Sequence, residues 1–537
     1  MDRKAFLAVV LSLIVLFAWQ IFFGPKTAKK QPEAVQQETV VEPKKVEKET
    51  VAAPVKPAPS GTVLSQAITG TEKDITVETP LYSAVFTTRG GTLKSYKLKH
   101  YRQTLAKDSD AIELVHVLDG MPRPLTVTFP ESNININPDS LFSSDTKAID
   151  LTNSQDSRRL ILTVSYPNSI KMEKIFTFSP EKYAVDLEVK IYNLTGYSIN
   201  QSPLLSWHQF VDPKLETDSY SHEGPVSFIS KSIDRHEVKK LESVKLLGPD
   251  VAWGAFESKY FIASIISQNP TLTSLSLSRD AGNMVSVSLK GPQSLIPPGQ
   301  TGVFGYTLYL GPKDHDLLNA QGVGLENAID FGDWLKWLAM PLLVALKFLY
   351  KYVHNYGIAI IILTILIKII FWPLGNKSYK SMKEMQKLQP KLAELKERYK
   401  GDKTKISQAT MELYKTHKVN PMGGCLPMVI QIPVFFGLYK TLLYAIELRH
   451  APFFWWIQDM SEKDPYYITP IIMGATMFIQ QKMTPSMGDP MQQKIMLIMP
   501  VVFTFLFLNF PSGLVIYWLF QNILSIGQQY YINKRPS

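Results

Sequence analysis

Cysteine is almost absent from this chain of 537 residues: Cys425 stands alone, so no internal disulfide can form and every folded part must rely on its own core. The sequence also lacks the His-Glu-x-x-His and Cys-x-x-Cys motifs of metal and redox sites, and it lacks the glycine-rich loop of nucleotide-binding proteins. We therefore expect no metal, no cofactor, no small-molecule substrate and no enzymatic centre. Any work that the protein does must proceed without bound ATP.

Acidic side chains are missing from five long apolar runs near the end of the chain. These runs are residues 358–374, 428–446, 468–483, 495–510 and 514–531. A sixth run, residues 5–23, lies near the start. Because each run approaches the length that crosses a bilayer, we predict six transmembrane helices, the first within an anchor of residues 1–24. The first run is long for the apolar part of a signal peptide, and no Ala-x-Ala site follows it, which favours an uncleaved anchor over a signal peptide.

The composition changes twice between the anchor and the later runs. Residues 25–75 are rich in Pro, Lys, Glu, Gln and Val without apolar periodicity, which is typical of a disordered linker. Within residues 76–318 apolar and polar residues alternate, for example in residues 160–166 and 304–310, and turn signals such as Gly90-Gly91 separate the runs. This pattern predicts a large antiparallel β-sandwich.

Three side chains in the predicted sandwich are of the types that bind sugars or peptides, namely Trp207, His208 and Glu223. Core and rim positions of a structural domain are the simpler interpretation of the same residues.

Residues 319–356 return to a helical period. An apolar stripe is formed by Trp334, Leu338, Leu342, Leu346 and Leu349. The tryptophans at its start predict an amphipathic helix lying in the membrane interface. A further span is the alternative, but Lys336, Pro341 and Lys347 interrupt the apolar residues.

The distribution of basic residues sets the expected topology. Residues 376–420 hold twelve Lys and Arg against five Asp and Glu, so the positive-inside rule places them in the cytoplasm. Counting spans from there puts Lys482, Lys494 and both chain ends inside, and the acidic loop of residues 459–464 outside. The β-domain then lies outside the membrane that the spans cross.

The basic cytoplasmic segment 376–420 carries two narrow apolar seams at helical spacing, one from Met385 to Tyr399 and one from Ile406 to His417. We predict two antiparallel helices, with Pro390 either kinking the first helix or beginning a new one. The exposed basic face suits ribosomal RNA, anionic lipids or acidic parts of a client, whereas a loop that only fixes topology is the alternative. The candidate contact residues are Lys383, Lys387, Lys391, Lys396, Arg398, Lys403 and Lys405.

Lys368 interrupts the run 358–374. A lysine near the middle of a spanning helix costs roughly 3 kcal/mol, so it is retained where it snorkels, pairs or functions. Thr364 lies one turn away on the same face. Later runs add Gln431, Tyr517, Gln521 and Asn522, and we predict that the two polar faces line a hydrated groove. Snorkelling of Lys368 to the cytoplasmic side is the alternative.

Several sequence motifs resemble the YidC membrane protein insertases of bacteria with two membranes, relatives of the mitochondrial Oxa and chloroplast Alb proteins. The resemblance is most specific over residues 357–532 and rests on Val-Asn-Pro-Met-Gly-Gly-Cys-Leu-Pro at 419–427, Gln-Ile-Pro at 431–433, Asp-Pro-Tyr-Tyr at 464–467, Asp-Pro-Met-Gln-Gln-Lys at 489–494 and Phe-Pro-Ser-Gly-Leu at 510–514.

The resemblance implies a five-span insertase core in residues 357–537, with a groove open to the cytoplasm and lipid but closed outside. It implies that Lys368 attracts the hydrophilic tail of a client, although the family usually has arginine there, whose planar fork lysine lacks. It also points to Tyr517 and Trp518 in the groove, where relatives often have paired tyrosines. The implied location is the inner membrane, with the β-domain in the periplasm, and the implied partners are nascent membrane proteins, lipids, the Sec translocon and the ribosome.

Two other classes fit part of the pattern. A transporter or channel would use Lys368 as a counter-charge for its substrate, but internal repeats and paired intramembrane charges are not evident in the sequence. A membrane-anchored periplasmic binding or sugar-modifying protein would place its function in residues 76–310.

Overall fold

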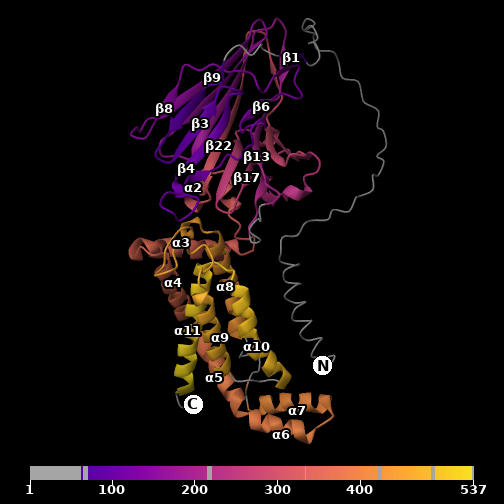
Figure 1. Ribbon diagram of the computed structural model, residues 1–537. Helices are drawn as coiled ribbons and strands as arrows, with labels where there is room; N and C mark the ends of the chain where they lie inside the picture. Colours follow the sequence, from indigo (N-terminus) through magenta and orange to yellow (C-terminus); the bar gives the residue numbers. More distant parts are fainter. Residues whose placement is uncertain are drawn as a thin grey trace, which may run out of the picture.

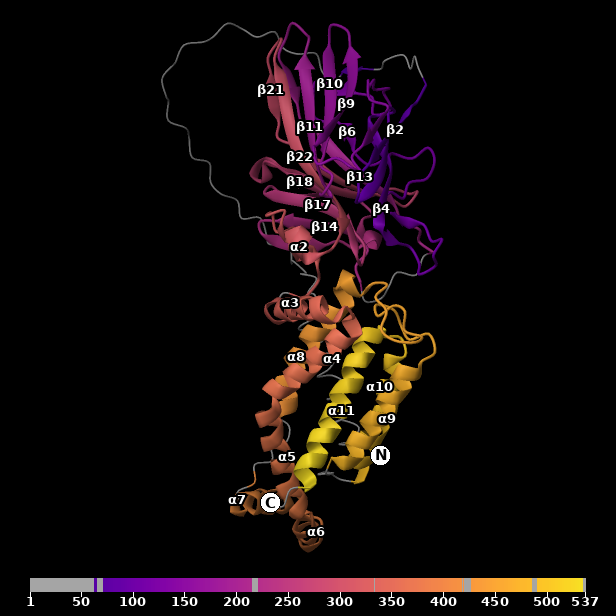
Figure 2. The ribbon, with the colours of Figure 1, turned by 90° about the vertical axis from the view of Figure 1, so that its left-hand side faces the viewer.

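A computed structural model describes residues 62–64, 71–214, 221–332, 334–417, 419, 426–484 and 490–534. A β-domain lies at one end of the molecule, a bundle of helices follows it, and a pair of short helices lies at the far end (Figures 1 and 2). The expected anchor, most of the expected linker and the motif residues 420–425 and 485–489 lie outside the described residues.

The β-domain is built around an eight-stranded antiparallel sheet. Its strands, in spatial order, are β15 (Ser232–Arg235), β14 (Gly224–Ile229), β17 (Val251–Glu257), β18 (Phe261–Ser267), β22 (Thr301–Pro312), β11 (Ala184–Asn193), β10 (Ile170–Phe178) and β9 (Arg158–Tyr166). Strands β9 and β22 cover the alternating runs at 160–166 and 304–310, so the period-two pattern located them correctly.

Two five-stranded sheets complete the main layers. One consists of β16 (Lys245–Leu247), β19 (Ser274–Arg279), β20 (Met284–Lys290), β13 (Leu204–Phe210) and β6 (Thr126–Thr128). The other consists of β5 (Ala111–Glu113), β4 (Thr92–Arg102), β3 (Tyr82–Thr87), β2 (Asp74–Glu78) and β8 (Ala148–Asp150). Two short pairs are formed by β1 (Thr62–Leu64) with β7 (Ile134–Ile136) and by β12 (Ile199–Gln201) with β21 (Ser294–Ile296).

The pairing is antiparallel except for β1 with β7 and β2 with β8, which are parallel. Alternation of side chains explains the layers: in β9, Leu160 and Leu162 are fully buried while Ile161 between them is exposed. Short 3-10 turns, η1 (Val238–Lys240) and η2 (Pro270–Leu272), lie between strands. The described β-domain is therefore rich in antiparallel sheet, as its sequence predicts.

A short segment joins the sandwich to the helices. It contains α2 (His315–Asn319), capped by the Asp314 carboxylate, and the 3-10 turn η3 (Leu325–Ala328). Helix α3 (Lys336–Val353) then lies across the top of the bundle, between the β-domain and the other helices (Figure 2). Ala339, Leu342 and Leu346 of α3 are buried, whereas Trp337 is 69% exposed.

The bundle contains helices at all five apolar runs of the last third. They are α4 (Tyr356–Ile370), continuing into α5 (Trp372–Lys387), then α8 (Leu426–Tyr444) with the 3-10 turn η5 (Ile446–Leu448), α9 (Ile468–Met483), α10 (Pro490–Phe507) and α11 (Ser512–Lys534). Helix α11 lies between α4–α5 on one side and α9–α10 on the other (Figure 2).

By length and hydropathy, no single helix among the described residues qualifies as a membrane span, although α4 and α5 qualify as a pair bent by 64°.

The far end of the molecule holds α6 (Gln389–Arg398) and α7 (Lys403–Thr416), which pack against each other (Figure 1). Of the two options for Pro390, the structure shows a new helix, because the proline lies in the first turn of α6. The predicted seam residues Leu392, Leu395 and Ile406 are half-buried in this pair.

Candidate functional site

Lys368 lies in the last turn of α4, two residues before the helix ends at Ile370. The apolar run 358–374 is therefore not one continuous helix, because it is divided between α4 and α5. The chain bends by 64° between α4 and α5, and Pro373 lies in the first turn of α5, where its missing N–H costs no helical hydrogen bond. The bend brings Lys368 close to the start of the basic segment.

The side chain of Lys368 reaches α11. Its half-buried ammonium donates a hydrogen bond of 2.8 Å to the Ser525 hydroxyl, and no carboxylate of the described residues pairs with it. Thr364, one turn back, is fully buried, and its hydroxyl donates to the Ile360 carbonyl oxygen over 2.7 Å. The predicted polar face of α4 is thus directed at α11, but its partner is a serine that the sequence analysis did not single out.

Helix α11 presents further polar groups to α4 and α5. The Gln528 amide donates to the Asn376 side-chain oxygen at 3.0 Å and to the Trp372 carbonyl oxygen at 3.2 Å. This contact needs glycine at 375, because a Cβ there would lie 2.7 Å from the Gln528 amide nitrogen. The spacing of Gln521, Ser525 and Gln528 by four and three residues is the signal that could have revealed this face.

Gln521 joins the polar face through its backbone, since its carbonyl oxygen accepts a hydrogen bond of 2.8 Å from the Ser525 hydroxyl. Its side-chain oxygen is buried and has no hydrogen-bond partner among the described residues. A buried acceptor without a partner costs about 1–3 kcal/mol, so a donor from water or a bound chain would be favourable here.

A second side of α11, about 100° around the helix from Gln521 and Gln528, is also polar. The Asn522 amide donates to the Thr476 hydroxyl at 3.3 Å, and the Gln529 amide donates to the Met483 carbonyl oxygen at 2.6 Å. Both partners belong to α9. Amide side chains therefore fix α11 on two sides.

Tyr517 and Trp518, which were predicted to line the groove, have aromatic neighbours. Tyr517 is 2% exposed and stacks on Phe435 of α8, with 6.2 Å between ring centroids. Trp518 contacts Phe435 edge-on at 4.6 Å and Phe507 of α10 at 5.0 Å. These rings link α8, α10 and α11.

Gln431 lies on α8, four residues before Phe435, and is half-buried. No hydrogen bond between described residues joins it to Lys368 or Gln521. The structure thus brings together Lys368, Thr364 and the Gln521 turn of α11, but not Gln431.

The predicted contact residues of the basic segment 376–420 are largely exposed on α5, α6 and α7. Several have partners within the segment: Lys387 pairs with Glu384 at 2.8 Å, Lys405 with Asp402 at 3.4 Å, and Lys391 lies 3.0 Å from His417. Lys383 donates to the Asn533 carbonyl oxygen of α11, and Arg398 lies over the Tyr399 ring. Lys396 is exposed, and the side chain of Lys403 lies outside the described residues.

The sugar-type residues of the sandwich occupy structural positions. Trp207 is fully buried, and its indole N–H donates to the Gln209 side-chain oxygen at 3.3 Å. His208 is paired with Ser286 across β13 and β20, and burial lowers its pKa to about 4. Glu223 is exposed. These contacts favour the simpler interpretation of the three residues.

Comparison with known proteins covers both parts of the chain. The family model described as the 60Kd inner membrane protein matches residues 348–537, and the YidC periplasmic domain matches residues 74–345. The membrane protein insertase YidC of Syntrophus aciditrophicus is 64% identical over 100% of both chains. That of Geobacter metallireducens is 44% identical over 99% of this chain and 98% of the relative. A solved structure described as an active YidC insertase covers 88% of this chain and 95% of its own, at 20% identity and a TM-score of 0.37.

These matches define the class first: an inner membrane protein with a periplasmic domain. Within that class, the chain belongs to the YidC family of membrane protein insertases. Its function is the insertion of membrane proteins, and its substrates are membrane proteins. The resemblance noted from the motifs is confirmed, and the transporter and periplasmic-binding alternatives are not favoured.

Proposed function

We propose that the protein inserts its clients without nucleotide, by way of a polar site between α4 and α11. The observation that carries this proposal is the Lys368 ammonium, which is half-buried at the end of an apolar helix and bonded only to a hydroxyl among the described residues. A lone cation in such surroundings attracts acidic groups of a client. At 4 Å and an effective dielectric constant of 20, that attraction amounts to about 4 kcal/mol.

The energetics explain why no nucleotide is required. A client segment of about twenty Leu-like or Val-like residues gains roughly 6–12 kcal/mol on entering lipid, at 0.3–0.6 kcal/mol per residue. Equilibrium therefore favours insertion, and what remains is the barrier to moving the polar tail of the client through hydrocarbon. The protein acts on this barrier rather than on the equilibrium, so we propose no enzymatic chemistry.

The proposed path of the client passes a polar part of the site and an aromatic part. The polar atoms of Lys368, Ser525 and Gln521 receive the tail of the client, and the aromatic contacts among Phe435, Tyr517 and Trp518 close the path toward the β-domain. The apolar segment of the client then leaves into lipid between α8 and α10. Separation of Trp518 from Phe435 or from Phe507 opens this exit.

For the membrane arrangement we propose six spans: the anchor of residues 1–24, α4, α8, α9, α10 and α11. Residues 25–75 form a linker, 76–318 the periplasmic sandwich, 319–356 an interfacial segment with α3, and 357–537 the insertase core. Both chain ends and residues 376–420 lie in the cytoplasm. The placement of the β-domain and of α6–α7 at opposite ends of the bundle supports this topology (Figure 1).

We assign first contact with the client to the basic cytoplasmic segment. Its exposed lysines suit acidic client segments, anionic lipid headgroups and the RNA of a translating ribosome. The Sec translocon is a further proposed partner, alongside which or without which the protein inserts its clients. Crosslinking from Lys396 to a stalled nascent chain tests the order of these contacts, because the order requires crosslinks before any protease protection of the client.

Reconstitution tests the function itself. The full chain is placed in liposomes without nucleotide, and protease protection of the acidic tail of a single-span client is measured beside empty liposomes. Protection above that of empty liposomes supports nucleotide-independent insertion, and equal protection contradicts it. Deletion of residues 76–310 separates the remaining alternative, because an insertase core retains activity and a periplasmic binding protein loses it.

A further inference from the structure

The outer end of α8, the end nearest the β-domain, is held by an ion pair to the segment that leaves the sandwich. The Lys440 ammonium lies 2.9 Å from a carboxylate oxygen of Asp330, and it also lies over the Tyr444 ring. Although burial alone would raise the pKa of Asp330, Lys440 and Arg235 hold it below its usual range. The carboxylate is therefore charged at neutral pH and available to Lys440.

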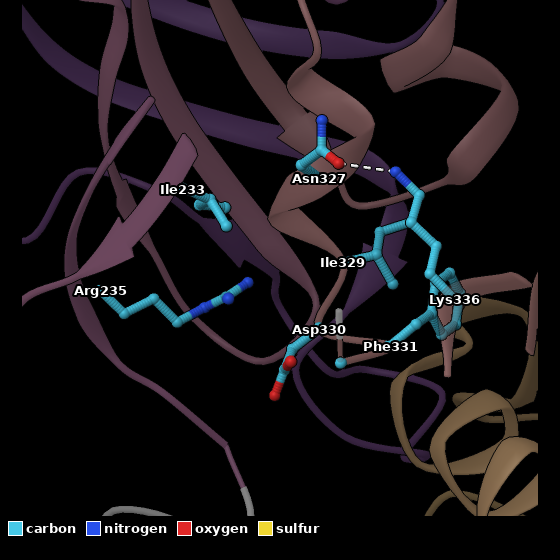
Figure 3. Close-up of a pocket in the computed structure, with 8 residues that line it drawn as sticks. Ile233, Arg235, Asn327, Ile329, Asp330, Phe331 and Lys336 are labelled. Carbon is cyan, nitrogen blue, oxygen red and sulfur yellow. Dashed lines mark hydrogen bonds between the residues drawn. The ribbon is translucent and has the colours of Figure 1, made fainter. Parts of the chain in front are cut away.

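Asp330 is itself next to a buried charge network of the β-domain. Arg235 donates to Glu257 at 2.7 Å and to the Ala328 carbonyl oxygen at 2.8 Å, and Lys313 pairs with the other oxygen of Glu257 at 3.2 Å. Glu257 and Lys313 are at least 97% buried. Arg235 and Asp330 reach toward the same space from different segments (Figure 3), where a cavity of about 30 Å³ has room for a single water molecule. The positive charge of Arg235 thus faces the same pocket as the Asp330 carboxylate.

A second lysine ties the same end of α8 to the same segment. The Lys347 ammonium of α3 lies 2.6 Å from Asp316, 3.2 Å from Asp314 and 3.2 Å from Glu447, which follows α8 in η5. Asp314 is also the cap of α2. Lys440 in α8 and Glu447 just after it thus tie the outer end of α8 at two points. Both points are linked by ion pairs to the residues between β22 and α3. We call Asp314, Asp316, Asp330, Lys347, Lys440 and Glu447 the outer clamp.

Helices α3 and α8 pack closely at the outer end of α8, which restricts movement of one helix relative to the other. The Thr441 hydroxyl donates to the Ala339 carbonyl oxygen at 3.0 Å, and a Cβ at Gly437 would lie 3.1 Å from the Leu338 side chain. The ion pairs and this contact therefore define one orientation for the last two turns of α8.

The orientation of α8 also sets the position of Phe435 in its ring contacts with α11. Phe435 lies five residues before Lys440, which is about 7.5 Å along the helix at 1.5 Å per residue. Its ring contacts Tyr517 and Trp518 of α11. A helix this short bends little between the two positions, so a change of tilt at Lys440 displaces Phe435 from Trp518.

We propose that the outer clamp positions α8 for insertion: its ion pairs hold Phe435 against Trp518, and Lys440 and Asp330 are positioning residues that set how far α8 stands from α11. This inference rests on the proposed role of the α8, α10 and α11 contacts as the exit for clients. The fixed point against which α8 is held is the segment between β22 and α3, which carries Asp314, Asp316 and Asp330 and lies outside residues 76–310.

The test is a double-mutant cycle on Lys440→Gln and Asp330→Asn, with Lys440→Arg as the conservative variant. Spin labels are attached at Ile432 of α8 and Ile523 of α11, both exposed, in a Cys425→Ser background. We expect each single neutral variant to broaden or shift the distance distribution between the labels and to change the initial insertion rate roughly threefold to tenfold, the size typical of coupled charges. The double variant should match the singles, and Lys440→Arg should restore both readouts.

The matched control is Lys94→Gln, because Lys94 and Asp74 form an exposed pair of the same composition at 2.7 Å, away from the clamp. It should leave distance and rate unchanged. An unchanged distance between the labels in both single variants overturns the proposal. A lower unfolding midpoint with an unchanged label distance also overturns it, because the ion pair would then only stabilise the fold. The distance measurement needs no client, so a wild-type protein that fails to insert would contradict the proposed function without touching this result.

Discussion

A fully buried lysine in the β-domain makes the pH dependence of stability a sharp test. Lys174 of β10 is completely enclosed, and its side chain reaches the carbonyl oxygens of Gly90 at 2.8 Å, Gly91 at 3.1 Å and Leu125 at 2.8 Å. Burial lowers the pKa of this ammonium from 10.5 to about 7. Above pH 7 the folded β-domain therefore holds Lys174 in its neutral form.

The difference in bound protons between the folded and unfolded states sets the direction in which stability changes with pH. Between pH 7 and 10.5 the unfolded chain keeps a proton on Lys174 that the folded chain has released, so stability rises with pH across this window. The slope is about 1.4 kcal/mol per pH unit, and the whole window corresponds to roughly 5 kcal/mol. Below pH 7 both states carry the proton, and this contribution becomes constant.

Urea unfolding of a fragment covering residues 62–332, followed by circular dichroism between pH 7.5 and 9.5, measures the slope. Lys174→Met is the comparison, because methionine has a similar unbranched shape and does not titrate. We expect the free energy of unfolding of the parent fragment to rise by roughly 2–3 kcal/mol relative to the variant over this range. Parallel curves would refute the reasoning and would show that the carbonyl oxygens keep Lys174 charged.

Three further predictions concern single positions in the helical part, and each is checked by unfolding in detergent. A Cβ at Gly474 would lie 2.0 Å from the Thr504 hydroxyl oxygen, so Gly474→Ala should destabilise the α9–α10 contact by roughly 1–3 kcal/mol, and adding Thr504→Ala should recover part of the loss. The Asp464 carboxylate accepts from the backbone N–H and hydroxyl of Thr469 at 2.8 and 2.7 Å, so Asp464→Ala should cost about 1–2 kcal/mol, whereas an unchanged midpoint would exclude a capping role. Trp455 is 84% exposed at a φ of 54°, and Trp455→Gly should raise stability by up to about 1 kcal/mol; a loss would mean that the stacking of its ring on Trp456, with 5.7 Å between centroids, outweighs the backbone strain.

Sequence periodicity located most of the fold because burial and periodicity are directly linked. The alternation in residues 160–166 became β9, and each apolar run of the last third became a helix. The bend after Lys368 was missed, since residues 358–374 read as one apolar run although Pro373 marks a new helix start. The outer clamp was not predictable, because Asp330 and Lys440 are 110 residues apart and meet only after the sandwich and α3 have folded.

Within the site, sequence reasoning found the unusual residue but not its partner. A lysine in an apolar run is conspicuous, whereas Ser525 and Gln528 look ordinary at the polar end of α11. Tyr517 was assigned to a wet groove because it lies one helical turn from Gln521 on the same face. Its ring instead stacks on Phe435, a contact that depends on how α8 packs against α11.

The central claim is that the charge of Lys368 attracts the acidic tail of a client. A double-mutant cycle that combines variants of Lys368 with variants of the client tail tests this claim most directly. Proteoliposomes with the parent protein, Lys368→Arg or Lys368→Gln are given clients whose tails carry acidic or neutral residues, and initial insertion rates are compared. The account predicts that Lys368→Gln slows the acidic-tail client at least tenfold, roughly 1.4 kcal/mol, while neutral tails change little and Lys368→Arg retains activity. Equal slowing of both clients would contradict electrostatic attraction, and no slowing of either would remove Lys368 from the mechanism.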